Sequence, residues 1–175
     1  LHRLRKLDRL SDRDVVNAQR VNLLDAGAPT PSVETLLHAF LPHKFVDHTH
    51  ANAVLALTDQ PNGTELAREV YGDRAALVDY VMPGFGLAKA TGDVFDANPD
   101  VEGLVLLKHG IFSMGETAEE AYERMIALFS LAEDRLAKGR RNVFVPAALP
   151  PALARPEEVA PIVRGAVALA LDEGQ

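Results

Sequence analysis

Short apolar runs alternate along this chain with segments whose apolar residues recur at helical spacing. The runs lie at 44–50, 74–82 and 101–115, and glycine or proline residues separate them from their neighbours. Runs of this length between such residues are typical of β-strands rather than of buried helices. Because strands that alternate with helices build a sheet covered by those helices, the order of segments predicts an α/β fold with a parallel sheet.

Helical spacing and capping residues indicate where the helices lie. The hydroxyl of Ser11 and the T-A-E-E capping box that begins at Thr117 are typical of helix starts. Helices are expected at 11–27, 32–42, 51–58, 63–72, 87–100 and 117–136. In the last of these helices, the spacing of the apolar residues predicts a buried face. That face would contain Tyr122, Met125, Ile126, Phe129 and Leu136.

The length and the distribution of proline predict the domain organisation. A chain of 175 residues is about one domain, and folding would bury roughly 70% of its surface. We expect one main domain over residues 1–138. Residues 139–175 begin with a proline-rich stretch, so we expect a connector there, followed by a helix from about residue 159 to 171.

Composition excludes several classes of protein. The chain contains no cysteine, so a transition metal would need histidine and carboxylate ligands. Its net charge of −7 argues against a nucleic acid or an anionic membrane as partner. It shows no apolar stretch of about 20 residues and no signal-peptide pattern, so we expect a soluble, cytoplasmic protein.

Three histidines at predicted strand ends form the most specific pattern. In F-V-D-H-T-H, His48 and His50 project to the same side of a strand because side chains alternate along it. His109 in L-L-K-H-G ends another predicted strand, at an edge where ligands of α/β sheets bind. Three imidazoles would fill three positions of a tetrahedral zinc and leave one open for substrate. The alternative is that the two nearby histidines are ordinary surface residues.

The segment P-S-V-E-T before these histidines has two interpretations. Glu34 in the first turn of a helix is commonly a favourable partner for the helix dipole, and His38 lies one turn later. The free N–H groups of the same turn, with the hydroxyl of Ser32, would also suit a bound phosphate. These residues alone leave both interpretations open.

Four motifs together carry a family resemblance. P-S-V-E-T at 31–35, D-H-T-H-A-N-A-V at 47–54, Y-V-M-P-G-F-G-L-A-K-A at 80–90 and L-L-K-H-G at 106–110 occur in this order. In this order, and over most of residues 1–136, the chain resembles the class II aldolase/adducin family. The sequences of these segments are most similar to the aldolase part of long bifunctional rhamnulose-phosphate aldolase/alcohol dehydrogenases.

The resemblance implies a site and a fold. It implies one zinc ion per chain on His48, His50 and His109, with Glu34 as the catalytic carboxylate and Ser32 at the substrate phosphate. It implies a three-layer α/β/α sandwich around a mainly antiparallel sheet, which replaces the parallel sheet expected above. It further implies a homotetramer with active sites at subunit boundaries.

The resemblance also implies a reaction. The expected activity is that of a zinc-dependent lyase in rhamnose catabolism. It would cleave a ketose 1-phosphate, L-rhamnulose 1-phosphate, to dihydroxyacetone phosphate and L-lactaldehyde, in a protein that is also fused to a dehydrogenase domain. The alternatives are an epimerase of pentulose phosphates, a dehydratase, a decarboxylase, or an adducin-like assembly domain without a metal. Retention of all three histidines argues against the last.

The chain departs from the family pattern in ways that affect substrate binding. Val33 stands where many members have a second serine before the acid. The resemblance places the loops that complete the phosphate pocket upstream of Leu1. A tyrosine of a neighbouring subunit acts as an acid in some members, and Tyr71 and Tyr80 are the candidates near that region.

Overall fold

The computed structural model describes residues 1–139 and 154–172, which belong to two separate units, Leu1–Arg140 and Arg141–Gln175. In the second unit, helix α7 spans Pro156–Asp172 and includes the helix expected from about residue 159. Most of the expected proline-rich connector lies outside the described residues. Over the part of the chain that is described, no helix is long and apolar enough to cross a bilayer.

The first unit is built on a four-stranded sheet in the order β1-β4-β3-β2. Its strands are β1 (Phe45–Thr49), β2 (Ala75–Val78), β3 (Gly103–Leu106) and β4 (Gly110–Gly115). The pairs β1/β4 and β3/β4 are antiparallel, and only β2/β3 is parallel. The mainly antiparallel sheet is confirmed, whereas the parallel sheet expected from the alternation of segments is wrong. The reason is that the loop between β3 and β4 is too short for a crossover connection, so the two strands form a hairpin.

Two helices begin where the capping residues indicate. Ser11 Oγ accepts a hydrogen bond from Asp14 N at 3.2 Å, and Thr117 Oγ1 accepts one from Glu120 N at 3.1 Å. The helices of the first unit are α1 (Asp12–Arg20), α2 (Thr35–Phe40), α3 (Asn52–Thr58), α4 (Gly63–Tyr71), α5 (Phe85–Ala97) and α6 (Ala118–Gly139), with 3-10 turns η1 (His2–Lys6) and η2 (Gly72–Arg74). Helix α1 ends at Arg20, before the expected residue 27, and the apolar residues Val21 and Leu24 that follow it are exposed rather than packed on the core.

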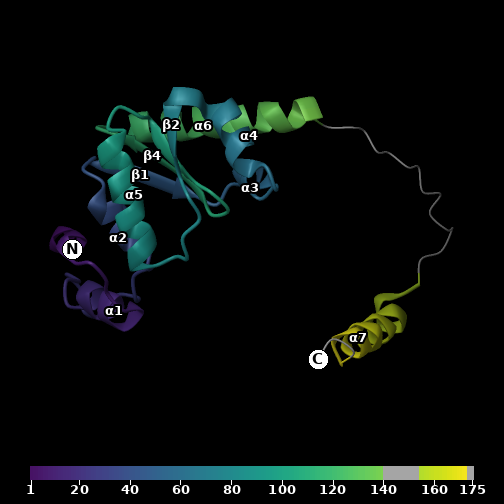
Figure 1. Cartoon of the computed structure of the whole chain (residues 1–175). Helices are drawn as coiled ribbons and strands as arrows, with labels where there is room; N and C mark the ends of the chain where they lie inside the picture. Colours follow the sequence, from purple (N-terminus) through teal and green to yellow (C-terminus); the bar gives the residue numbers. More distant parts are fainter. Residues whose placement is uncertain (140–153, 173–175) are drawn as a thin grey trace. The chain divides into compact units, whose positions relative to one another are not determined.

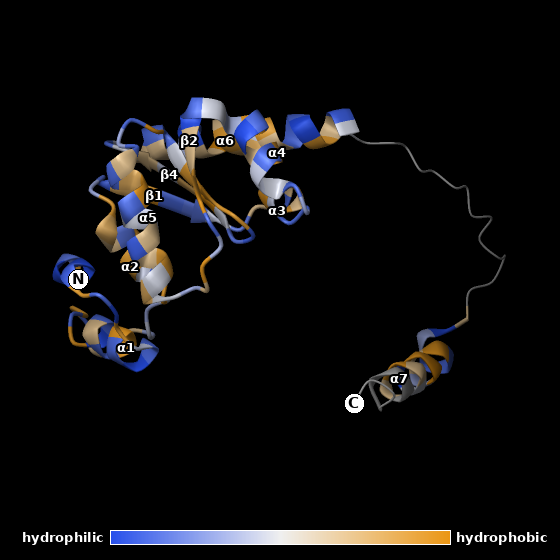
Figure 2. Cartoon of the chain, in the orientation of Figure 1, coloured by the Kyte–Doolittle hydropathy of each residue, from blue (hydrophilic) through white to orange (hydrophobic). Residues whose placement is uncertain are grey.

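Helices cover both faces of the sheet, as Figure 1 shows for α2 and α5 on one side and α4 and α6 on the other. Alternate residues of the central strands divide between two apolar clusters. Figure 2 shows the apolar colouring of these central strands. One cluster joins α1, α2 and α5 to Leu104, Leu106, Phe112 and Met114. The other joins α3, α4 and α6 to Val105, Leu107 and Ile111. The three-layer α/β/α sandwich is therefore confirmed.

Helix α6 packs on the sheet with part of the expected face, together with small residues that lie outside that face. Met125 is buried as expected, but Tyr122 is 57% exposed and Ile126 is 41% exposed. The face that contacts the sheet consists mainly of small or aliphatic residues, all fully buried, namely Ala121, Leu128 and Ala132. Phe129 and Leu136 pack on the margin of this cluster. Alanine allows the helix to approach the sheet closely, and a pattern search for large apolar residues underestimates such a face.

Candidate metal-binding site

The antiparallel register brings the three histidines together at one edge of the sheet. His48 lies in β1 and His50 directly follows it, while His109 ends the loop that leads into β4. Because Thr49 pairs with Ile111, the end of β1 lies beside the start of β4. A Cβ atom on Gly110 would lie 2.5 Å from the backbone oxygen of Thr49 and 3.1 Å from ring carbons of His48 and His50. Only glycine allows the two strands to approach this closely.

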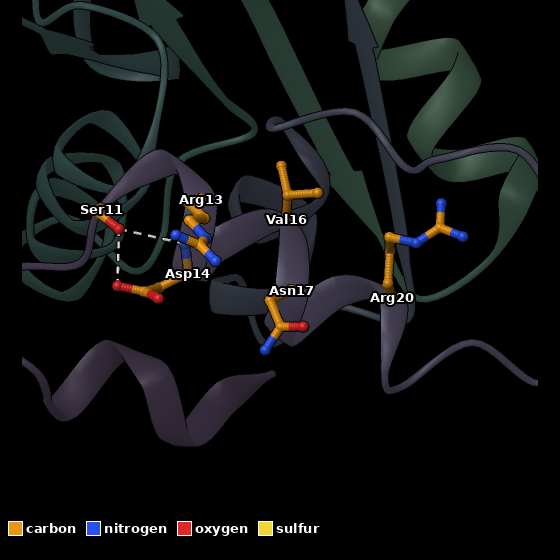
Figure 3. A pocket seen from close by; sticks show the side chains of 6 residues that line it. All are labelled: Ser11, Arg13, Asp14, Val16, Asn17 and Arg20. Carbon is orange, nitrogen blue, oxygen red and sulfur yellow. Dashed lines mark hydrogen bonds between the residues drawn. The ribbon is translucent and has the colours of Figure 1, made fainter.

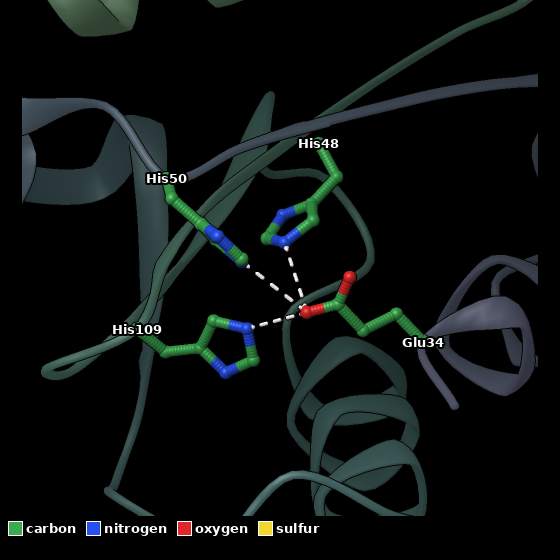
Figure 4. Close-up of side chains that lie close together, drawn as sticks. All are labelled: Glu34, His48, His50 and His109. Carbon is green, nitrogen blue, oxygen red and sulfur yellow. Dashed lines mark hydrogen bonds and ion pairs between the residues drawn. The ribbon is translucent and has the colours of Figure 1, made fainter. Parts of the chain in front are cut away.

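Glu34 reaches the three imidazoles from the helical layer. It is the N-cap residue of α2, and its carboxylate points between the rings, as Figure 4 shows. Its Oε1 atom lies 2.8 Å from Nε2 of His109, 3.2 Å from Nε2 of His50 and 3.6 Å from Nε2 of His48. One ligand atom from each of the four residues lies within 4.8 Å of the others. Segments distant in the sequence thus converge on one point.

The orientation of His48 fits a metal ligand. Its Nδ1 atom lies 3.0 Å from the carbonyl oxygen of Ile111, and because a carbonyl only accepts, Nδ1 carries the proton. Its ring also stacks on Phe112, with ring centroids 4.0 Å apart. Nε2, which faces the cluster, is buried and has no hydrogen-bond partner. A backbone carbonyl that fixes the ring and leaves the other nitrogen free is typical of metal-binding histidines. The four residues could therefore hold a divalent metal ion.

The electrostatic environment gives His48 and Glu34 the protonation states that a metal requires. Burial lowers the pKa of His48 to about 4, so its imidazole is neutral at pH 7. Burial alone would raise the pKa of Glu34, but the hydrogen bond with His109 and the interactions with the imidazoles outweigh it, so the pKa is lowered. A neutral imidazole and an ionised carboxylate bind metals without first releasing protons.

We predict that the metal-free protein loses stability as the pH falls from 6.5 to about 4. In that window the unfolded chain protonates His48 at its ordinary pKa of 6.5, whereas the folded chain does not until about pH 4. The free energy of unfolding should fall by about 1.4 kcal/mol per pH unit from this group. The lowered pKa of Glu34 adds to this loss as the pH falls below the ordinary value of 4.5 for that carboxyl. Denaturant titrations at several pH values should show that the free energy of unfolding changes less with pH in His48→Gln than in the wild type. An unchanged pH dependence would contradict the lowered pKa of His48.

Two polar residues hold the segment that carries Glu34. Ser32 Oγ accepts a hydrogen bond from Glu34 N at 3.2 Å, and the Nε2 atom of Gln19 donates one to the Ser32 carbonyl at 2.9 Å. Gln19 is only 2% exposed. The sequence interpretation missed this residue because a helical glutamine usually faces solvent. The available signal was its position four residues after Val15, on the buried face of α1.

A hollow of about 360 Å³ opens beside the cluster. Glu34, His50 and His109 line it together with Asp59, Tyr80 and Lys108, whereas Ser32 is not among its lining residues. Of the two candidate tyrosines, Tyr80 is 52% exposed and lines this hollow. Tyr71 is buried in the core, and burial raises its pKa to about 12. A hollow of this size suits a small, polar ligand.

A larger hollow of about 650 Å³ lies along α1 and is shown in Figure 3. Its lining residues all belong to α1 or its N-cap, and they are Ser11, Arg13, Asp14, Val16, Asn17 and Arg20. The hydrogen bonds of Ser11 with Asp14 there are those of a helix cap. We therefore assign the chemistry to the cluster at the sheet edge.

Comparison with known families agrees with this geometry. Residues 4–136 match the model of the family described as "Class II Aldolase and Adducin N-terminal domain". The matched range contains the four clustered residues, the hollow and the whole sheet.

Individual relatives show the same similarity. The chain is 41% identical over 128 residues to the "Uncharacterized oxidoreductase YuxG" of Bacillus subtilis, covering 73% of this chain but 19% of that protein. It is 37% identical, with a TM-score of 0.71, to the N-terminal class II aldolase domain of a conserved protein from Thermoplasma acidophilum, covering 77% of this chain and 62% of that one. A sugar-phosphate aldolase from Thermotoga maritima shares the fold at 22% identity and a TM-score of 0.52, covering 66% and 58% of the two chains.

Proposed function

Because the chain belongs to the class II aldolase and adducin family, we propose that it is a zinc-dependent lyase acting on a ketose 1-phosphate. The proposed substrate is L-rhamnulose 1-phosphate, which would be cleaved reversibly to dihydroxyacetone phosphate and L-lactaldehyde in rhamnose catabolism. The observation that carries the proposal is the position of the Glu34 carboxylate among three imidazoles beside an open hollow. An assembly domain has no need of such a cluster.

The proposed mechanism assigns separate tasks to the histidines and the glutamate. His48, His50 and His109 would hold the zinc ion, which when bound supplies Lewis acidity that stabilises negative charge on the substrate oxygens. Glu34 would carry a proton to and from the reacting carbon as the carbon–carbon bond breaks or forms. Its lowered pKa keeps it ionised and able to accept that proton. The buried amide of Gln19, through Ser32, would keep Glu34 in place.

Two further residues have proposed roles in the same reaction. Tyr80 is the better candidate for the residue that takes the proton from the substrate hydroxyl during cleavage and returns it to the aldehyde oxygen during condensation, because it lines the hollow and Tyr71 does not. We retain Ser32 as a ligand of the substrate phosphate on the basis of the resemblance alone. In this structure its hydroxyl already accepts the N–H of Glu34.

The assembly and the wider protein are also proposals. The hollow has an open side, which is consistent with a homotetramer whose subunits complete each other's sites. Light scattering of the full-length protein should show a tetramer, and a fully active monomer would contradict it.

The B. subtilis relative is named an oxidoreductase and is far longer than this chain, which supports a fusion with a dehydrogenase domain. A cytoplasmic location is consistent with the absence of cysteine.

A panel of sugar phosphates tests the proposed reaction. Purified full-length protein should release dihydroxyacetone phosphate from L-rhamnulose 1-phosphate. A chelator should abolish the release, and added zinc should restore it. The panel should include pentulose phosphates, because the same cluster could serve an epimerase. Interconversion of pentulose phosphates without release of cleavage products from any ketose phosphate would contradict the aldolase proposal and favour the epimerase.

A further inference from the structure

Lys108 adopts an unusual backbone conformation next to the cluster. Its φ angle is +61°, and no other non-glycine residue in the described parts of the chain has a positive φ. Side chains disfavour this left-handed region, in which glycine or asparagine is usual. The hydrogen bonds of Leu107 N with Val78 O and of His109 N with Leu106 O hold the hairpin loop on both sides of Lys108. The loop therefore keeps a lysine where glycine would be favoured.

Lys108 also supplies the hollow with charge. It lines the hollow with Glu34 and Asp59, and no other lysine or arginine is among the described residues that line it. The ion pairs of the described residues do not include Lys108. The proposed zinc ion would be held by the histidines and would bind the substrate oxygens at the reacting carbons, so a phosphate elsewhere in the hollow is favoured by a separate cation, and Lys108 is the one that lines it. A lysine ammonium is a compact charge that commonly binds phosphate.

We propose that Lys108 binds the phosphate group of the substrate and makes the site specific for phosphorylated sugars. This inference rests on the proposed function. It explains why a lysine occupies a backbone position that disfavours side chains, since unfavourable conformations kept at a site point to a role there. The ordinary alternative is a solvated lysine at a hairpin tip, which has no effect on ligands.

Four variants of the zinc-loaded full-length protein separate these interpretations. Lys108→Met removes the charge and keeps the length, Lys108→Arg keeps the charge, and Lys108→Gly suits the backbone. Lys44→Met is the matched control, because Lys44 is an exposed lysine that precedes the opposite end of β1. Calorimetry should measure the binding of dihydroxyacetone phosphate and of dihydroxyacetone to each protein.

We expect Lys108→Met and Lys108→Gly to weaken binding of dihydroxyacetone phosphate by about 10- to 100-fold, the usual range for a charged hydrogen bond. Binding of dihydroxyacetone should not change. Lys108→Arg should retain most of the affinity, and Lys44→Met all of it. Lys108→Gly should also melt no lower than the wild type, because glycine adopts this φ readily. Weaker phosphate binding without loss of stability distinguishes a ligand contact from a structural role.

The outcomes distinguish this inference from the proposed function. Unchanged phosphate binding in Lys108→Met, with wild-type cleavage of ketose phosphates, would overturn the role of Lys108 and leave the aldolase proposal standing. Phosphate binding that depends on Lys108, in a protein that cleaves no ketose phosphate, would support the anion site and contradict the aldolase proposal. A wild-type protein with no affinity for dihydroxyacetone phosphate would overturn both.

Discussion

Glu34→Gln should retain the metal and the fold while slowing cleavage by about 10²–10⁴-fold, the usual contribution of a positioned acid or base. Glutamine keeps the size and the polar character of the side chain, so the loop held by Ser32 should stay in place. It cannot accept the proton, however. Metal analysis, thermal melts and single-turnover cleavage should be measured on the same preparation.

The matched control for Glu34 is Asp59→Asn, which removes a carboxylate from the same hollow but lies outside the cluster. We expect its turnover to change far less. If Glu34 only favours the helix dipole, its replacement should cost roughly 0.3–1 kcal/mol of stability and leave turnover nearly unchanged. Normal turnover of Glu34→Gln would therefore remove the catalytic assignment, and loss of its metal would identify Glu34 as a ligand instead.

His48→Ala should lose the metal and with it all measurable cleavage. The Ile111 carbonyl fixes the His48 ring, and its free Nε2 faces the cluster, so its removal takes away the most rigidly held ligand. Removal of a residue that only hydrogen-bonds to a metal ligand lowers metal affinity by about 10- to 100-fold. We therefore expect removal of the ligand His48 itself to lower metal affinity by more than about 100-fold. Competition with a chelator of known affinity measures it.

Two companion variants separate metal loss from misfolding. His50 is 54% exposed, so His50→Ala should keep the fold and still bind the metal more weakly. His38→Gln should keep both the metal and the activity. His38 contacts the same Phe112 ring as His48, with ring centroids 5.3 Å apart, but it is outside the cluster. Equal metal affinity in the wild type and His50→Ala would contradict the three-histidine assignment.

The sequence predicts those parts of the site that depend on short-range geometry. The alternation of side chains along a strand places His48 and His50 on one side, and the structure shows both rings at one point. The hydroxyls of Ser11 and Thr117 mark helix starts because each satisfies a free backbone N–H group. The family motifs identify Glu34, because they associate residues that are distant along the chain.

The remaining features depend on contacts between distant segments. The direction of β4 is set by a hairpin loop in which Lys108 has a positive φ, and residue propensity does not predict lysine there. The burial of the Gln19 amide depends on its hydrogen bond to the Ser32 carbonyl, which lies on a different segment of the chain. The face of α6 is determined by how closely Ala121 approaches the sheet, so the size of Tyr122 and Ile126 misled the prediction.

X-ray absorption at the zinc edge of the zinc-loaded full-length protein tests the central proposal, a metal centre made by His48, His50 and His109. The proposal predicts one tightly bound zinc per chain, with three imidazole nitrogens at about 2.0–2.1 Å. His50→Ala should lower the number of imidazole ligands of any zinc that remains. A zinc environment without imidazoles, or one that the His50→Ala substitution does not change, would contradict it.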